Sequence, residues 1–170
     1  LSPTGSGKSL IIYALVRWHL LKEREILIIV PTVSLVEQLY KDFIEYGWNV
    51  RDVHKIMGGV EKYTDQPVVI STWQSIYKEP KKFFERFDVI IGDEAHQYKA
   101  KSLTGILTKC YDAKYRVGLT GTLDGMEAHQ LVLEGLFGRV DRVTKTADLM
   151  KKGHLTPLKV RVVLLRHGWV

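Results

Sequence analysis

The chain has 170 residues, 45% of them hydrophobic and 26% charged, which suits one globular domain with a substantial core. Its formal net charge of +6 favours an anionic partner, with nucleic acid as the first candidate and a basic surface kept for solubility as the alternative. Its single cysteine, Cys110, excludes an intrachain disulfide and a cysteine-rich metal cluster and suits a reducing cytosol, and its apolar stretches are far shorter than the ~20 residues of a membrane span.

Strand and helix signals alternate along the chain. Short apolar runs predict strands over residues 25–30, 50–57, 68–71, 87–92, 115–119 and 156–165. The spacing of apolar residues predicts helical segments over residues 9–23, 35–44, 73–77, 80–86, 102–110, 128–136 and 148–152. This alternation is typical of an α/β fold with a mostly parallel sheet and helices on both faces, which binds ligands at the carboxyl ends of its strands.

A glycine-rich segment, residues 3–9 (PTGSGKS), stands directly before the first predicted helix. Glycines let successive backbone N–H groups point at phosphate oxygens, and the helix N-terminus adds a partial positive charge. Lys8 would reach the β- and γ-phosphates of a nucleoside triphosphate, and the Ser9 hydroxyl would bind Mg²⁺. Ser2 replaces the first glycine of the strict motif, which weakens a kinase or GTPase interpretation, and an ordinary turn before a helix is the structural alternative. The candidate phosphate-binding residues are Thr4, Gly5, Ser6, Gly7, Lys8 and Ser9.

An acidic motif, Asp93-Glu94-Ala95-His96, follows the apolar run 89–92. Two carboxylates at the end of a buried strand are costly unless something uses them. Asp93 would hold Mg²⁺ and Glu94 would orient and deprotonate an attacking water, with a solvated helix cap as the alternative. His96 would contact the γ-phosphate region or relay the nucleotide state to residues 120–122, with a packed structural histidine as the alternative. The catalytic candidates are Lys8, Asp93, Glu94 and His96, and the metal candidates are Ser9 and Asp93.

Taken in order, the segments between residues 2 and 125 resemble the motifs of superfamily 2 helicases of the DExH group. The glycine-rich loop is similar to motif I, the DEAH box to motif II, and residues 119–123 (LTGTL) to motif III. The similarities to motifs Ia, Ib and Ic fall on residues 31–38, 58–59 and 71–75. Within the superfamily, the segment STWQS and the tail from residue 136 to 160 resemble the phage UvsW-type recombination helicases, which are related to XPB-like and type I and III restriction translocases.

The resemblance implies a RecA-like first helicase lobe over residues 1–145, with its N-terminal strand expected upstream of Leu1. It also implies a linker and first strand toward a second RecA-like lobe over residues 146–170. The first lobe would bind ATP and Mg²⁺ and contact the backbone of one DNA strand with little sequence specificity. Trp73 would stack on a base or, as an aromatic residue on a short helix, belong to the core. The nucleic-acid candidates are Pro31, Thr32, Gly58, Gly59, Thr72 and Trp73, and the coupling candidates are Thr120, Gly121 and Thr122.

The expected function is that of the ATP-binding lobe of a DNA-stimulated helicase or translocase, acting on branched or forked DNA in recombination and repair. The expected location is the cytoplasm, the host cytoplasm if the protein is phage-encoded. An RNA helicase of the same group and a nucleotide- and nucleic-acid-binding module without turnover stay open, whereas a nucleotide kinase is disfavoured because it is not expected to carry a DEAH box. An arginine finger from a second lobe is typically worth ~10³–10⁵ in rate, so the isolated chain is expected to bind nucleotide weakly and hardly hydrolyse it.

Overall fold

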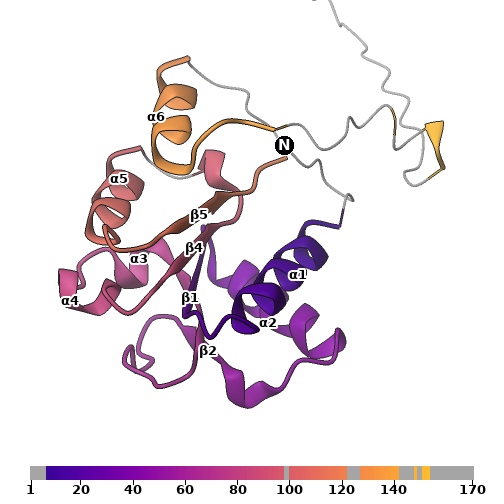
Figure 1. Cartoon of the computed structure of the whole chain (residues 1–170), viewed down its shortest axis with the longest axis vertical. Coiled ribbons are helices and arrows are strands. Elements are labelled where there is room, and N and C mark those ends of the chain that lie inside the picture. The colour runs from indigo at the N-terminus through magenta and orange to yellow at the C-terminus, as the bar shows by residue number, and fades with distance from the viewer. Residues whose placement is uncertain (1–6, 98–99, 122–126, 142–147, 149–150, 154–170) are drawn as a thin grey trace, which may run out of the picture.

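A parallel sheet organises the chain, whose computed structural model describes residues 7–97, 100–121, 127–141, 148 and 151–153. Its strands are β1 (Ile26–Val30), β2 (Val53–Ile56), β3 (Val68–Thr72), β4 (Val89–Gly92) and β5 (Tyr115–Gly118). They lie in the order β2-β3-β1-β4-β5, and every neighbouring pair is parallel (Figure 1). The predicted mostly parallel sheet is therefore confirmed, and the carboxyl ends of its strands meet at one edge.

Helices cover both faces of this sheet, as predicted. They are α1 (Lys8–Leu20), α2 (Val33–Glu45), α3 (Trp73–Ile76), α4 (Lys81–Phe84), α5 (Ala100–Lys109) and α6 (Glu127–Phe137). In Figure 1, α1 and α2 lie on one side of the strands, and α3, α4, α5 and α6 lie on the other. The buried side chains divide in the same way, because one core cluster draws its helical members from α1 and α2 and the other from α3 to α6.

The strand β1 shows why its sequence is a continuous apolar run. Ile26, Ile28 and Val30 point to the core under α1 and α2, whereas Leu27 and Ile29 point to the core on the opposite face. All five side chains are fully buried. A central strand of a parallel sheet has helices on both faces, so neither set of alternate positions tolerates polar residues.

The largest difference at the start of a predicted strand is found at β2. Residues 50–57 were predicted as a strand, but Val50–Asp52 form a 3-10 turn and β2 starts at Val53. The Asn49 side chain accepts a hydrogen bond from the Arg51 N–H at 3.0 Å, and this cap holds the turn. The predicted strand 156–165 lies outside the described residues, as does part of the predicted helix 148–152.

The glycine at the end of β5 is required by close packing, which leads to a stability prediction. A Cβ on Gly118 would lie 2.9 Å from ring atoms of Phe137 in α6 and 3.4 Å from its Cβ. Gly118→Ala is therefore expected to lower the free energy of unfolding by about 1–3 kcal/mol, since a packed side chain must be displaced. Denaturant unfolding of the full-length protein measures this change.

Gly105→Ala in α5 is the matched control for Gly118→Ala. Gly105 is exposed within a helix, and a Cβ there would meet nothing within 4 Å. Alanine is favoured over glycine inside a helix by up to ~1 kcal/mol, so this variant is expected to be neutral or slightly stabilised. Equal destabilisation by both substitutions would contradict the packing argument.

Two further properties concern the core and the helices. Cys110 is buried, and this burial raises the pKa of its thiol to about 12, so the thiol is a poor nucleophile in the folded protein.

Within the described part of the chain, the helices all lack the length and apolarity needed to cross a membrane.

Candidate functional site

A cavity of about 440 Å³ lies where the last three residues of the glycine-rich segment face the first two residues of the DEAH box. It is bordered by the start of α1, by one side of α2, and by the two residues that follow β4. Its lining residues are Gly7, Lys8, Ser9, Leu35, Gln38, Leu39, Asp42, Asp93 and Glu94. The structure therefore brings Lys8 and Ser9 together with Asp93 and Glu94. Thr4, Gly5 and Ser6 lie outside the described residues.

The phosphate-loop side of the cavity is the N-terminus of α1. Gly7 caps this helix in the left-handed conformation, at φ 78°, which glycine adopts without strain. Lys8 and Ser9 occupy the first helical turn, where backbone N–H groups have no partner within the helix and the helix dipole is positive. This end of α1 is therefore suited to an anion such as a phosphate group.

The acidic side of the cavity is the turn after β4. The Asp93 N–H donates to the Ile29 carbonyl oxygen at 2.9 Å, which extends the pairing of β4 with β1 by one residue. Asp93 is only 8% exposed, and its Oδ1 accepts a hydrogen bond from the Glu94 N–H at 2.9 Å. Burial raises the pKa of the Asp93 carboxyl, and the nearby Lys8 opposes this shift. A buried carboxylate is stabilised by a cation, so Asp93 is suited to a metal ion.

Glu94 faces the loop lysine directly. Its backbone is in the left-handed region at φ 49°, an uncommon conformation for a residue with a side chain. Its Oε1 accepts from the Lys8 ammonium group, and both side chains are largely buried, at 19% and 14% exposure. The two residues are 86 positions apart in the sequence. This ion pair joins the predicted phosphate-binding and water-activating groups in one cavity.

His96 connects the acidic motif with the segment after β5. Its Nδ1 lies 2.5 Å from the Thr120 hydroxyl and 3.5 Å from Glu94 Oε2. The backbones are joined as well, because the Ala95 N–H donates to the Leu119 carbonyl oxygen at 2.9 Å. This geometry is consistent with the predicted relay from His96 to Thr120, while Thr122 lies outside the described residues.

The predicted nucleic-acid residues gather at the carboxyl ends of β1, β2 and β3, but they differ in exposure. Thr32 is exposed and its hydroxyl caps α2 by accepting from the Leu35 N–H at 3.3 Å. Thr72 is only 4% exposed, and its hydroxyl contacts Ser75 at 2.8 Å. Trp73 is half-buried and packs against the core cluster under α3 to α6, which supports the alternative that it belongs to the core.

The three remaining nucleic-acid candidates at this edge also differ in exposure. Pro31 is buried, and its carbonyl oxygen accepts from the Gln74 side chain at 3.4 Å. Gly58 and Gly59 are exposed in the turn after β2, and Gly59 has φ 81°. Direct contact with a ligand is therefore open to Thr32, Gly58 and Gly59, whereas Pro31 and Thr72 support the local backbone.

Sequence reasoning missed the polar side of α2 that borders the cavity. Gln38 and Asp42 line the cavity, and Tyr46, at the end of the same helix, contacts the Ser9 hydroxyl at 3.0 Å. These three residues are spaced by four, so they follow one side of a helix. The four-residue spacing could have predicted that these polar residues share one side of the helix. It could not predict which neighbouring element that side would face.

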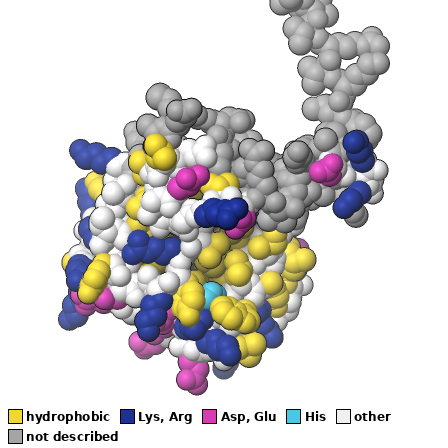
Figure 2. Space-filling view, turned by 45° about the horizontal axis from the view of Figure 1, so that its top comes forward, with side chains coloured by type: hydrophobic (Ala, Val, Ile, Leu, Met, Phe, Trp, Pro, Cys, Tyr) yellow, Lys and Arg dark blue, Asp and Glu magenta, His cyan; other side chains and the backbone are white. Residues whose placement is uncertain are grey.

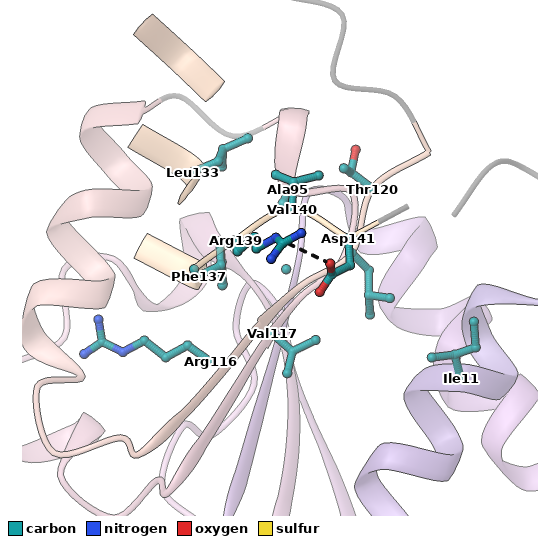
Figure 3. A pocket seen from close by; sticks show the side chains of 13 residues that line it. Ile11, Ala95, Arg116, Val117, Thr120, Leu133, Phe137, Arg139, Val140 and Asp141 are labelled. Carbon is teal, nitrogen blue, oxygen red and sulfur yellow. Dashed lines mark ion pairs between the residues drawn. The ribbon is translucent and has the colours of Figure 1, made fainter. Parts of the chain in front are cut away.

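A second cavity, of about 250 Å³, lies beside β5 and contains none of the predicted catalytic residues (Figure 3). Apolar side chains from β5 and α6 border it, and Arg139 and Asp141 form an ion pair at 3.9 Å at its rim. On the face seen in Figure 2, the Lys and Arg side chains of the described residues are spread rather than gathered in one patch. Neither feature identifies a nucleic-acid site, so the carboxyl edge of the sheet stays the candidate.

Comparison with known proteins gives the family. Residues 1–125 match the family model described as "Type III restriction enzyme, res subunit". The chain belongs to this family. It is also 37% identical to the ATP-dependent DNA helicase uvsW of Enterobacteria phage T4 over 171 aligned residues, which cover 97% of this chain and 34% of that protein. The chain thus spans about a third of the length of this curated relative.

Solved structures of helicases share the family's fold. The crystal structure of the UvsW helicase from bacteriophage T4 matches with a TM-score of 0.73 and 40% identity, covering 80% of this chain and 50% of that one. The Hef helicase domain of Pyrococcus furiosus matches with a TM-score of 0.69 at 22% identity, covering 81% of this chain and 33% of that one, and at this identity the match supports the fold alone. The predicted RecA-like fold and the resemblance to superfamily 2 helicases are therefore confirmed.

Proposed function

We propose that this chain is the ATP-binding lobe of a DNA-dependent motor, a helicase or translocase that acts on branched or forked DNA. The observation that carries the proposal is the meeting of Lys8, Ser9, Asp93 and Glu94 in one cavity. Phosphate-binding groups beside an acidic pair are what phosphoryl transfer from a nucleoside triphosphate requires.

The cavity residues have separable roles in this chemistry. The α1 N-terminus and Lys8 bind the phosphates, and the ammonium group moves from Glu94 toward them. Glu94 then accepts a proton from the attacking water, and its unusual backbone conformation holds the carboxylate at the cavity. Ser9 and Asp93 have the oxygen donors that Mg²⁺ prefers, and this ion, when bound, neutralises charge on the β- and γ-phosphate oxygens.

Coupling to DNA is proposed to run through the strand ends. His96 links Glu94 to Thr120, the first of the predicted coupling residues Thr120, Gly121 and Thr122. Thr32, Gly58 and Gly59 offer exposed backbone and hydroxyl groups at the same edge of the sheet, which suits sequence-independent contact with a nucleic-acid backbone. The name of the T4 relative, an ATP-dependent DNA helicase, favours DNA over RNA for this chain.

The proposed organisation places the first lobe in residues 1–145 and a connection toward a second RecA-like lobe in residues 146–170. The T4 relative is about three times as long as the aligned region, which supports a larger motor. Closure of two lobes around a nucleotide is a known way to assemble a catalytic site and to move a bound strand. The first lobe alone is proposed to hydrolyse ATP hardly at all. The reason is that the arginine finger, which stabilises the transition state, is assigned to the second lobe.

The test is nucleic-acid stimulation of the ATPase activity of the full-length protein. Forked DNA, single-stranded DNA and an RNA strand of the same sequence are compared at equal nucleotide concentration and fixed salt, because phosphate contacts depend strongly on salt. We expect forked DNA to stimulate most and RNA least. Equal or stronger stimulation by RNA would favour the RNA helicase alternative, and no stimulation by any strand would favour a binding module without turnover.

A further inference from the structure

Tyr46, at the C-terminal end of α2, contacts the phosphate-loop helix. Its hydroxyl oxygen lies 3.0 Å from the hydroxyl oxygen of Ser9. The two residues come from different helices and are 37 positions apart in the chain. A serine hydroxyl has one proton to donate and two lone pairs to offer. If Ser9 donates to Tyr46, both lone pairs stay available for a cation.

The surroundings of Tyr46 hold it in place. Its N–H donates to the Asp42 carbonyl oxygen at 2.9 Å, and its own carbonyl oxygen accepts from the Tyr13 hydroxyl at 2.8 Å. The rings of Tyr13 and Tyr46 lie edge to face, with centroids 5.2 Å apart. Tyr13 also packs edge to face on Phe43 and Trp48, both buried. A side chain that is 38% exposed is thus tied to the core through its neighbour.

We propose that Tyr46 is a positioning residue for magnesium binding, because it orients the Ser9 hydroxyl. The inference rests on the proposed function, in which Ser9 is a metal ligand. By accepting a hydrogen bond from the Ser9 hydroxyl, the phenol oxygen directs the serine lone pairs away from α2. Partners that orient a metal ligand in this way typically contribute 10–100-fold to metal affinity or activity.

The test is a magnesium titration of nucleotide binding, which needs no turnover. A fluorescent, non-hydrolysable ATP analogue is bound to the full-length protein in EDTA and then in rising MgCl₂. We expect Tyr46→Phe to raise the Mg²⁺ midpoint roughly tenfold. Its affinity for the analogue in EDTA should stay close to that of the wild type, and so should its thermal midpoint, because phenylalanine keeps the ring on Tyr13.

Tyr111→Phe is the matched control. Tyr111 is 68% exposed and lies in the segment before β5, at the opposite end of the strands from the cavity. This variant also loses one phenol hydroxyl, and we expect no change in its Mg²⁺ midpoint. An unchanged midpoint in Tyr46→Phe as well would overturn the inference. So would a fall in metal-free affinity or thermal stability large enough to explain the shift.

Ser9→Ala separates this inference from the proposed function. We expect Ser9→Ala to raise the Mg²⁺ midpoint, and Tyr46→Phe to add nothing in the Ser9→Ala background, since Tyr46 acts through Ser9. A shift with Ser9→Ala but not with Tyr46→Phe would overturn only the role of Tyr46. An unshifted midpoint with Ser9→Ala would overturn the metal role of Ser9 itself. Additive shifts in the double variant would show that Tyr46 does not act through Ser9.

Discussion

Glu94→Gln is expected to lower ATP turnover by the full-length protein roughly 10²–10⁴-fold, the usual contribution of a positioned general base. Glutamine has nearly the same shape as glutamate but cannot accept a proton from water at neutral pH. It also removes the carboxylate that pairs with Lys8, so the ammonium group is free for phosphate. We therefore expect nucleotide binding to be retained. Steady-state ATPase assays with DNA measure turnover, and analogue titration measures binding.

Glu85→Gln is the control for this substitution. Glu85 is exposed just after α4, outside the cavity, and it loses the same charge when it becomes glutamine. Its turnover should match that of the wild type. Turnover by Glu94→Gln within a few-fold of the wild type would show that Glu94 does not activate the water.

Lys8→Ala is expected to weaken nucleotide binding about 10–100-fold, because hydrogen bonds to charged groups contribute ~1.5–3 kcal/mol. The same change leaves Glu94 without its cation in a largely buried position. Glu94 would then repel the phosphates that Lys8 previously attracted. In contrast to Glu94→Gln, the loss should appear in binding, and it is measured by titrating the fluorescent analogue at saturating Mg²⁺.

Lys41→Ala controls for the general loss of positive charge. Lys41 lies on α2 but is 78% exposed, and it pairs only loosely with Glu45 at 3.7 Å. Exposed pairs of this kind contribute little, so we expect unchanged nucleotide affinity. Similar weakening in both variants would indicate that net charge, and not the position of Lys8, governs binding.

The secondary structure was largely predictable because its signals are local. The apolar run of β1 and the helical spacing of α2 need only neighbouring residues to be recognised, and both elements match within two residues. The predicted start of β2 was wrong because the Asn49 cap stabilises a turn over three residues in place of strand pairing. Such a cap depends on one side chain and leaves no periodic signal.

The sequence motifs predicted many of the residues that form the candidate site, but they did not predict how exposed each residue is. The glycine-rich loop and the DEAH box place Lys8 and Glu94 at the edge of a parallel sheet, and the structure brings them together. The exposure of the nucleic-acid candidates was not predictable in the same way. Thr32 and Thr72 both stand next to apolar strand residues, yet one is exposed and the other is only 4% exposed. Thr72 is the last residue of β3 and pairs with Val30 in the sheet, whereas Thr32 lies beyond the end of β1 and caps α2.

The sequence by itself determined the alternating α/β elements, the family and the two motifs whose residues border the cavity at the start of α1. Only the tertiary structure decided which side of α2 faces the start of α1, and hence that Tyr46 contacts Ser9. The physical reason is the distance along the sequence over which each interaction acts. Periodicity and turn formation depend on residues close together in the sequence, whereas this contact depends on how two helices pack on the same face of the sheet. A row of polar residues on a helix indicates that this side is not buried in the hydrophobic core. Which residues it contacts depends on how the helices are arranged on the sheet.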